Sequence, residues 1–257
     1  IPKEILITTM QKNQKYFPIF DEKSNLTNNF IIVANSDDNK GFIKIGNERV
    51  ISARLSDAKF FWEKNKNQSL VKQVSNLKSI NFFSKLGTLF DKVQRIRKLG
   101  SMIADQLDIN KEKVEVSASI CKTDLLSDLV REYPELQGIL GSYFAKAQGF
   151  DEDISLAIKE HYLPSGLDSK VPKNLVSISV SLVDKIDTLV GFFGIDEKPT
   201  SSKDPFALRR SAFGLLRIII ENNLSVQLKD LFNYSSVLYA EQGFKFTNQK
   251  TLVELNN

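Results

Sequence analysis

The sequence predicts an α+β fold that is predominantly α, with a small mixed α/β module at the N-terminus followed by a helical domain. Short β-branched and aromatic runs, which are typical of strands, occur before about residue 65. Beyond that point apolar residues recur at intervals of three and four, which is the period of a helix. We therefore expect a mixed module over residues 1–65, an all-helical domain over 66–222, and a helical linker or the start of a following region over 223–257. No strand is expected beyond residue 66.

Two strands and one helix are expected in the N-terminal module. Residues 14–20 (QKYFPIF) read as the first strand and residues 30–34 (FIIVA) as a second, buried strand. Between them, residues 21–29 are polar and indicate a turn. An apolar face at helical spacing predicts a helix over 48–62, and the polar residues 65–73 then read as a connection.

Helical periodicity continues through the rest of the chain. The predicted helices cover residues 77–83, 86–105, 114–131, 136–146, 151–162, 174–193, 204–220 and 228–239. In the helix at 204–220, Asp204 is the expected N-cap and Pro205 the first helical residue. That helix is apolar nearly all round apart from Arg210 and Arg217, so we expect it to be buried on most sides.

Composition narrows the class of protein. The hydrophobic fraction of 42% and the charged fraction of 26% are ordinary for a soluble globular protein. The single Cys121 excludes an intrachain disulfide and a cysteine zinc cluster, and it suits a reducing, cytoplasmic location. The single His161 excludes a multi-histidine metal site. We find no membrane-length apolar run, no signal pattern and no initiator Met, so the chain reads as a fragment of a longer protein.

No residue set predicts catalysis within this chain. Cys121 and His161 could pair, but nothing marks a third orienting group or an oxyanion hole. Gly138 and Gly141 lie in apolar helical sequence, and no glycine-rich phosphate motif occurs. We therefore expect no catalytic residue, no metal and no cofactor in this chain.

A basic group is the first candidate for binding. One side of the predicted helix 86–105 and the residue before it carry five cations against a single acid, Asp91. We expect this side to face outward and to contact RNA phosphates weakly and with strong salt dependence, although a plain solvated face is the alternative. The five candidates are Lys85, Lys92, Arg95, Arg97 and Lys98. Replacing Lys92, Arg95 and Lys98 by Ala is expected to leave the melting temperature nearly unchanged.

Three arginines of the helix at 204–220 form a second basic group. For these a structural role is favoured over RNA contact, because a partly buried arginine usually requires a carboxylate partner. The arginines are Arg209, Arg210 and Arg217, and the expected partners of the last two are Asp184, Asp187 or Glu221.

Three separated segments resemble one protein family. The longest is DKIDTLVGFFGIDEKPTSSKDPFALRRSAFGLLRI; the others are QKNQKYFPIFDEKSNL with FIIVANSDD, and GNERVISARLSDAKFFWEKN. They are similar to the signature segments of the β subunit of the bacterial tetrameric glycyl-tRNA synthetase, over roughly residues 1–220. Asn13 stands where that family usually has His.

The resemblance implies a function. The family catalyses ATP-dependent attachment of glycine to tRNA(Gly). It implies that ATP and Mg are bound by the α subunit, which holds the active site, while the β subunit is required for tRNA binding. On this interpretation the chain is a central fragment that has the α subunit and tRNA(Gly) as partners, has no membrane contact and makes no glycyl-adenylate alone. The anticodon-binding domain of the family is missing from it.

A second resemblance concerns the helical domain. Asp124, His161 and Asp184 follow one another in the order of the metal-binding residues of an HD-superfamily phosphohydrolase. Lys122 and Thr123 precede Asp124 where that superfamily has its His-Asp pair, and too few imidazoles remain for a metal. We therefore favour a degenerate HD-like site with structural residues. A metal-dependent phosphohydrolase and a purely structural helical spacer are the alternative functions.

Overall fold

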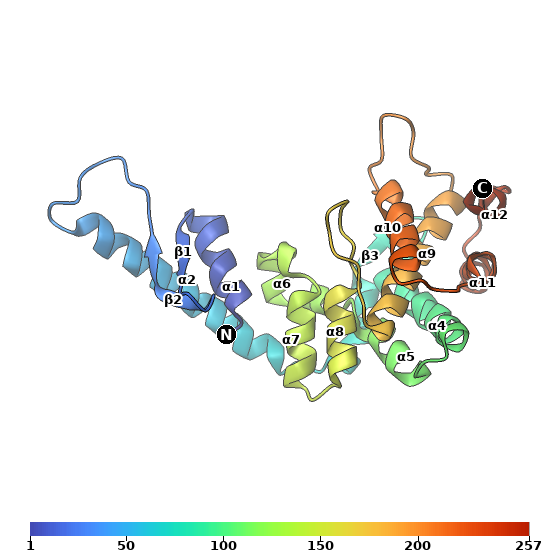
Figure 1. The fold of residues 1–257 in the computed structure, drawn as a ribbon, viewed down its shortest axis with the longest axis horizontal. Coiled ribbons are helices and arrows are strands. Elements are labelled where there is room, and N and C mark those ends of the chain that lie inside the picture. Colours follow the sequence, from blue (N-terminus) through green and yellow to red (C-terminus); the bar gives the residue numbers. More distant parts are fainter. Residues whose placement is uncertain (257) are drawn as a thin grey trace.

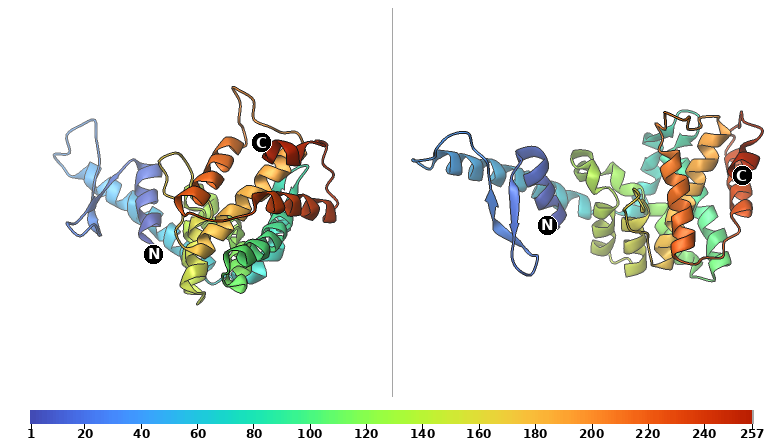
Figure 2. Two further views of the ribbon diagram at one scale, coloured as in Figure 1. Left: turned by 45° about the vertical axis from the view of Figure 1, so that its right-hand side comes forward. Right: turned by 45° about the horizontal axis from the view of Figure 1, so that its top comes forward.

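The chain forms an elongated molecule in which a small N-terminal module projects from a larger helical body (Figure 1). The computed structural model describes residues 1–256, apart from the side chain of Asn13. The family difference at Asn13 therefore lies outside the described side chains. Both further views keep the module to one side of the body (Figure 2). The described residues are mostly helical with two small two-stranded sheets, so the predicted predominance of helix is confirmed.

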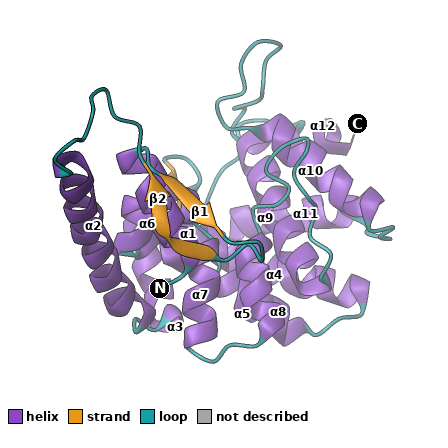
Figure 3. Ribbon diagram, turned by 60° about the vertical axis from the view of Figure 1, so that its left-hand side comes forward, coloured by secondary structure: helices purple, strands orange, loops and turns teal. Residues whose placement is uncertain are grey.

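The N-terminal module contains two short helical segments, a hairpin and one long helix. In chain order these are α1 (Lys3–Thr8), the π-helical turn η1 (Thr9–Asn13), β1 (Phe17–Phe20), β2 (Leu26–Ile31) and α2 (Phe42–Lys66). The strands pair antiparallel, with Phe17 opposite Ile31 and Phe20 opposite Leu26. Figure 3 shows this hairpin in orange beside the helices of the module.

Strand β2 differs from its prediction in position and in burial. It begins at Leu26, because the Asp21 carboxylate accepts hydrogen bonds from the N–H groups of Lys23 and Asn25 (2.9 and 2.7 Å) and closes the turn early. Ile31 is 54% exposed, so the prediction of a buried strand is wrong. A hairpin of two strands has too little surface to enclose its own side chains.

Helix α2 extends beyond both predicted ends. Near its N-terminal half, Ile51 packs with Met10 and Tyr16 in a small separate core. Near its C-terminal end, Trp62 joins the large core of the body and stacks on Phe144 with 5.6 Å between ring centroids. Helix α2 therefore links the small core of the N-terminal module to the large core of the body.

The body consists of short and medium helices and one small sheet. In chain order they are α3 (Leu70–Gln73), η2 (Val74–Ser79), β3 (Asn81–Phe83), β4 (Gly87–Thr88), α4 (Leu89–Leu107), α5 (Lys111–Ile120), η3 (Thr123–Leu126), α6 (Asp128–Glu132), η4 (Pro134–Leu136), α7 (Ile139–Ala147), α8 (Glu152–Glu160), α9 (Leu175–Gly194), α10 (Leu208–Glu221), α11 (Leu228–Glu241) and α12 (Thr251–Asn256). The helices predicted at 86–105, 136–146, 151–162, 174–193 and 228–239 are confirmed as α4, α7, α8, α9 and α11.

The predicted helix at 77–83 is wrong, and so is the expectation that no strand follows residue 66. Strands β3 and β4 pair there, with Asn81 opposite Thr88 and Phe83 opposite Gly87. Gly87 has a φ of 84°, which an L-residue rarely adopts, so the chain reverses at this point. Thr88 then forms a capping box with Asp91 and starts α4 one turn later than periodicity alone indicates.

The helix predicted over 114–131 is broken into α5, η3 and α6. Two polar side chains cause the break, because each bonds to backbone outside the helix interior. The Ser127 hydroxyl accepts a hydrogen bond from the N–H of Val130 (3.1 Å) and caps α6. The buried Asp124 carboxylate accepts from the N–H groups of Gly138 and Gly141 (2.6 and 3.2 Å), which turns the chain toward α7.

Helix α9 is the centre of the body. It contacts α4, α8, α10 and α11, and nearly every one of its residues is buried. The neighbouring α10 is not buried on most sides as predicted, since Phe213, Leu216 and Ile220 are 46%, 48% and 68% exposed. It begins at Leu208 with Ala207 as its N-cap, so the predictions of Asp204 as N-cap and Pro205 as first helical residue are wrong. The Asp204 carboxylate lies three residues before that N-cap and accepts the N–H groups of Leu208 and Arg209 (2.8 and 3.0 Å).

The C-terminal residues belong to the same core as the body. Leu231, Leu238 and Tyr239 of α11 are buried in the large apolar cluster, and α12 follows where no regular element was predicted. The boundaries at residues 65 and 222 stay predictions. Among residues 1–256 no helix is both long and apolar enough to cross a bilayer.

Candidate functional site

The basic side of α4 does not face outward as a whole. The side chains of Lys92 and Arg95 are 3% and 0% exposed, so the prediction that they contact solvent is wrong. They point into the body, toward the acids of α9. Helix α4 packs along α9 with its apolar residues, and Lys92 and Arg95, three residues apart on that face, are buried together with them.

Asp187 of α9 is the centre of this buried ion cluster. Its carboxylate accepts hydrogen bonds from Arg95 Nε and Nη2 (2.6 and 3.2 Å), from Lys92 Nζ (3.1 Å) and from the Tyr239 hydroxyl (3.3 Å). Burial alone raises the pKa of Asp187, but Arg95 and Lys92 outweigh it and lower the pKa below its usual value. The Arg95 guanidinium also lies over the Tyr239 ring, 3.8 Å from its centroid. The cluster thus ties α4, α9 and α11 together.

Asp184, one turn earlier on α9, is held by two lysines. Its Oδ1 lies 3.2 Å from Lys92 Nζ and its Oδ2 lies 3.1 Å from Lys122 Nζ. Burial works against the charged form of Asp184, but Lys122 and Lys92 keep its pKa far below the usual range. The Asp184 carboxylate is therefore paired with two ammonium groups and not with a metal ion.

The other two residues of the HD-like set are buried but bind no common centre. His161 Nδ1 lies 2.6 Å from the carbonyl oxygen of Ile158, and its Nε2 has no hydrogen-bond partner among the described residues. Burial, and then the charge of Lys122, hold the pKa of His161 well below its usual value, so the ring is neutral. Burial raises the pKa of Asp124 to about 6, although the amides of Gly138 and Gly141 act in the opposite direction. Within residues 1–256 no group of three or more His, Cys, Asp or Glu is placed to hold a metal ion.

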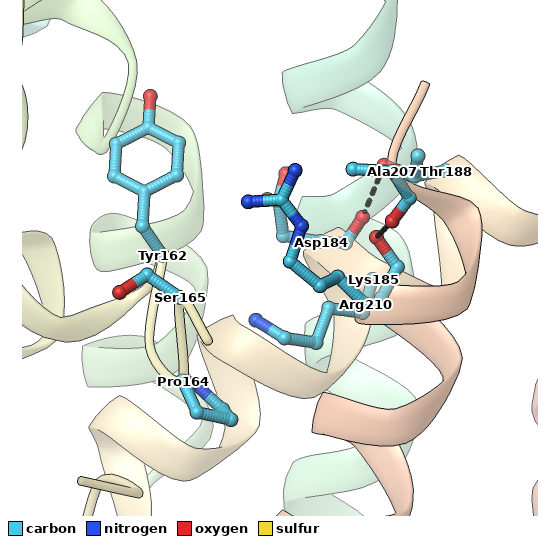
Figure 4. A pocket seen from close by; sticks show the side chains of 9 residues that line it. Tyr162, Pro164, Ser165, Asp184, Lys185, Thr188, Ala207 and Arg210 are labelled. Atoms are coloured by element: carbon cyan, nitrogen blue, oxygen red, sulfur yellow. Dashed lines mark hydrogen bonds between the residues drawn. The ribbon is translucent and has the colours of Figure 1, made fainter. Parts of the chain in front are cut away.

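A cavity of about 200 Å³ adjoins this cluster, between α9, α10 and the segment after α8 (Figure 4). Two cations border it. Lys185 is 6% exposed and donates to the Leu163 carbonyl (2.8 Å) and the Ser181 hydroxyl (3.0 Å). Arg210 is exposed. The lining residues are Tyr162, Pro164, Ser165, Asp184, Lys185, Thr188, Ala207, Arg210 and Ser211.

The three arginines of α10 have different roles. Arg217 pairs with Glu221 (2.6 Å), one of its expected partners, and donates to the carbonyls of Leu167 and Ser169 (2.7 and 2.9 Å). Arg209 donates to a carbonyl at the surface. The prediction that Arg210 pairs with Asp184, Asp187 or Glu221 is wrong, because Arg210 forms no ion pair within the described part of the chain. Other cations already pair with the two aspartates: Lys92 with both, and Lys122 with Asp184.

The remaining basic candidates are at the surface. Lys85, Arg97 and Lys98 are exposed. Lys85 lies 3.9 Å from Glu197, and Lys98 pairs with Glu241 at 2.8 Å. Of the five cations predicted to form an outward face, these three are the ones that a polyanion could reach.

The sequence reasoning missed Tyr239, the inward direction of Lys92 and Arg95, and their pairing with Asp187. A signal was available: Lys92 and Arg95 are spaced three apart on one helix, and Asp184 and Asp187 are spaced three apart on another. Two such pairs match when the helices pack side by side. Tyr239 carries no comparable signal, because its role depends on where α11 docks.

Cys121 is inert. It is fully buried, its thiol lies 3.4 Å from the Ala118 carbonyl, and burial raises the pKa of the thiol to about 12. A nucleophilic cysteine requires a lowered pKa and access to substrate, and Cys121 has neither.

Comparison with known proteins shows which family this chain belongs to. The family model described as glycyl-tRNA synthetase beta subunit matches residues 1–256. The chain is 45% identical over 242 residues to the glycine–tRNA ligase beta subunit of Rhodospirillum centenum, which covers 92% of this chain and 34% of that protein. It is 44% identical over 236 residues to the beta subunit of Pseudomonas savastanoi pv. phaseolicola, which covers 91% and 34%. With the beta subunit of Haemophilus influenzae strain PittGG it shares 41% identity over 257 residues, 99% and 37% of the two chains.

These matches define an aminoacyl-tRNA synthetase subunit as the class of protein. The chain belongs to the glycyl-tRNA synthetase beta subunit family. It spans about a third of the length of the curated relatives that it matches.

Proposed function

We propose that this chain is the part of a glycine–tRNA ligase beta subunit that supports tRNA binding during ATP-dependent glycylation of tRNA(Gly). The observation that carries the proposal is the family match over residues 1–256. On this proposal the partners are the alpha subunit and tRNA(Gly), and the alpha subunit supplies the active site with its ATP and Mg. The complex acts in the cytoplasm.

The chemistry of the described residues supports a role without catalysis. Cys121 is a buried thiol with a raised pKa, and His161 is a buried neutral imidazole. Asp184 is occupied by Lys92 and Lys122. A metal-dependent phosphohydrolase requires free ligands at such a centre, so the hydrolase alternative has little support. We further propose that residues 66–222 are an HD-like domain, which superposition of α4 to α9 on a solved HD hydrolase would test.

The surface candidates for tRNA contact are Lys85, Arg97 and Lys98. All three are exposed, so their side chains can reach RNA phosphates, and such contacts are independent of sequence and sensitive to salt. The ion pairs of Lys85 and Lys98 are surface pairs, which contribute about 0–1 kcal/mol and are easily exchanged for a phosphate.

The test uses the complete enzyme with both subunits and measures tRNA affinity at several salt concentrations. We expect the triple variant Lys85→Ala, Arg97→Ala, Lys98→Ala to bind tRNA more weakly. The slope of log K against log salt should fall by about one unit for each phosphate that the variant no longer neutralises. The melting temperature should change little, because these side chains are exposed.

A matched control removes three other exposed cations. Lys159, like Arg97, forms no ion pair with the described residues. Lys111 pairs with Asp105 at 2.7 Å and Lys146 pairs with Glu152 at 2.8 Å, as Lys85 and Lys98 pair with acids in the first set. Replacing these three lysines by Ala changes the net charge equally but on α5, α7 and α8. If both triple variants keep the affinity and salt slope of the parent, the tRNA-contact proposal fails and the structural-spacer alternative is favoured.

A further inference from the structure

The cavity beside Asp184 has the size of a small anion site. Its volume is about 200 Å³, below the roughly 300–1,000 Å³ of pockets that enclose a drug-sized ligand. It is walled by α9, by α10 and by the segment that contains Tyr162 and Pro164 (Figure 4). A single phosphate group with a few waters fits this space.

Lys185 is a buried cation that has no ion-pair partner within 4 Å among the described residues. Lys92, Lys122 and Lys185 are all buried, but only the first two have a carboxylate within 4 Å among the described residues. Lys185 donates instead to a carbonyl and a hydroxyl. A buried charge without an opposite charge is strongly unfavourable. Burial accordingly lowers the pKa of Lys185 to about 8.

Arg210 supplies a second cation with unused donors. Its guanidinium makes no hydrogen bond or ion pair with the described side chains and backbone, although it borders the cavity. A guanidinium presents a planar set of N–H donors that matches two oxygens of a phosphate. Figure 4 shows Arg210 and Lys185 reaching from their helices toward Tyr162, Pro164 and Ser165 on the opposite wall.

The charge balance of the cavity favours an anion. Among the described residues that line it Asp184 is the only acid, and Lys92 and Lys122, which do not line it, already pair with Asp184 at 3.2 and 3.1 Å. The charges of Lys185 and Arg210 are therefore in excess. Ser165 and Ser211 also line the space. Their hydroxyls donate to Ser169 Oγ and to the Ala207 carbonyl (3.4 and 3.2 Å), and rotation of either O–H would redirect it to an anion.

We propose that this cavity binds a phosphate group, held by the Arg210 guanidinium and the Lys185 ammonium group. The phosphate is either free inorganic phosphate or the terminal phosphate of an RNA strand, which present the same oxygens. The proposal does not require that the chain supports tRNA binding, because inorganic phosphate alone tests it.

The experiment titrates the complete protein with inorganic phosphate in a calorimeter, at constant ionic strength and pH 7. We expect saturable binding that Arg210→Gln weakens by about tenfold to a hundredfold, the usual effect of losing a charge-assisted hydrogen bond. Lys185→Met should have an effect of the same order. Because Lys185 is buried and its replacement can disturb folding, the exposed Arg210 carries the decisive comparison.

The matched control is Arg209→Gln. Arg209 is adjacent, exposed and on the same helix, but its guanidinium donates to the Thr200 carbonyl and does not border this cavity. Arg209→Gln removes one positive charge from the same surface and should leave phosphate binding unchanged. An equal loss for Arg209→Gln and Arg210→Gln would overturn the proposal, since general surface charge would then explain the binding.

A second arm identifies the source of the phosphate. It compares a short single-stranded RNA carrying a 5′-phosphate with the same RNA carrying a 5′-hydroxyl. Tighter binding of the 5′-phosphate form that Arg210→Gln abolishes supports a terminal RNA phosphate. Equal binding of the two RNAs, together with Arg210-dependent binding of inorganic phosphate, supports free phosphate. Absence of saturable phosphate binding, or binding that Arg210→Gln leaves intact, overturns the proposal.

Discussion

Replacement of Asp187 by Asn tests the buried ion cluster directly. The amide has nearly the shape of the carboxylate but no charge, so the change leaves Arg95 and Lys92 buried beside a neutral group. Four hydrogen bonds end on the carboxylate, from two nitrogens of Arg95 and from Lys92 and Tyr239, and the carboxylate is fully buried. Removing one partner of a buried ion pair costs about 3–5 kcal/mol, because the other charge stays buried without compensation.

The assay is urea unfolding followed by circular dichroism. We expect Asp187→Asn to lower the free energy of unfolding by about 3–5 kcal/mol, a large part of the roughly 5–15 kcal/mol of an ordinary domain. The comparison is Lys98→Ala, which breaks the pair with Glu241, whose two side chains are 48% and 50% exposed. That change should cost at most about 1 kcal/mol. If the two variants lose the same small amount, the cluster does not stabilise the body and our reasoning is refuted.

The burial of Lys92 and Arg95 contradicts the expected effect of replacing them by Ala. Lys92, Arg95 and Lys98 were expected to be replaceable by Ala with little change in melting temperature, and the structure supports this for Lys98 alone. A double variant separates lost attraction from uncompensated charge. Arg95→Met with Asp187→Leu removes both charges, so it should recover part of the stability that Asp187→Asn loses.

Two further predictions concern close packing and pH. A Cβ at Gly191 would lie 2.8 Å from Cζ of the buried Tyr239, so Gly191→Ala should destabilise the protein by about 1–3 kcal/mol. Gly46 lies on a helix with open space around it, so Gly46→Ala should stabilise the protein by about 0.5–1 kcal/mol. Thermal unfolding of the two variants measures both effects. Burial raises the pKa of Asp124 to about 6, above its unfolded value near 3.9, so the folded state binds more protons between these values. As the pH falls from 7 to 4, this difference should add about 2 kcal/mol to the free energy of unfolding. Asp124→Asn should lack that gain when urea midpoints at the two pH values are compared, and an equal pH dependence in both proteins would contradict the assignment.

Local sequence patterns were sufficient to predict a helix and its ends where the capping residue lies next to that helix in the sequence. Asn174 caps α9 by accepting the N–H of Val176 (2.9 Å), and Asp151 caps α8 in the same way, so both helices were predicted close to their ends. The patterns failed where a polar residue bonds outside its own helix. Asp124 interrupts a run of helical periodicity because its partners are amides at the start of α7, which lie 14 and 17 residues away in sequence.

The candidate site shows the same limit. Sequence reasoning selected Lys92, Arg95 and Asp184 but gave the two cations the wrong environment. A cation on an amphipathic helix faces solvent in most proteins, and only the acids of α9, about ninety residues later, make its burial favourable. The cavity between Lys185 and Arg210 could not be predicted, because it exists only where α9, α10 and the segment after α8 meet.

The sequence by itself determined the family, the predominance of helix, the positions of most helices and the lack of a cysteine or histidine cluster. These properties depend on residue identity and on contacts within one or two helical turns. The tertiary structure decided which charges are buried, which pairs they form and which cations stay free. The reason is physical: the energy of a charge depends on its distance from water and from opposite charge, and both distances are set by how separate helices pack.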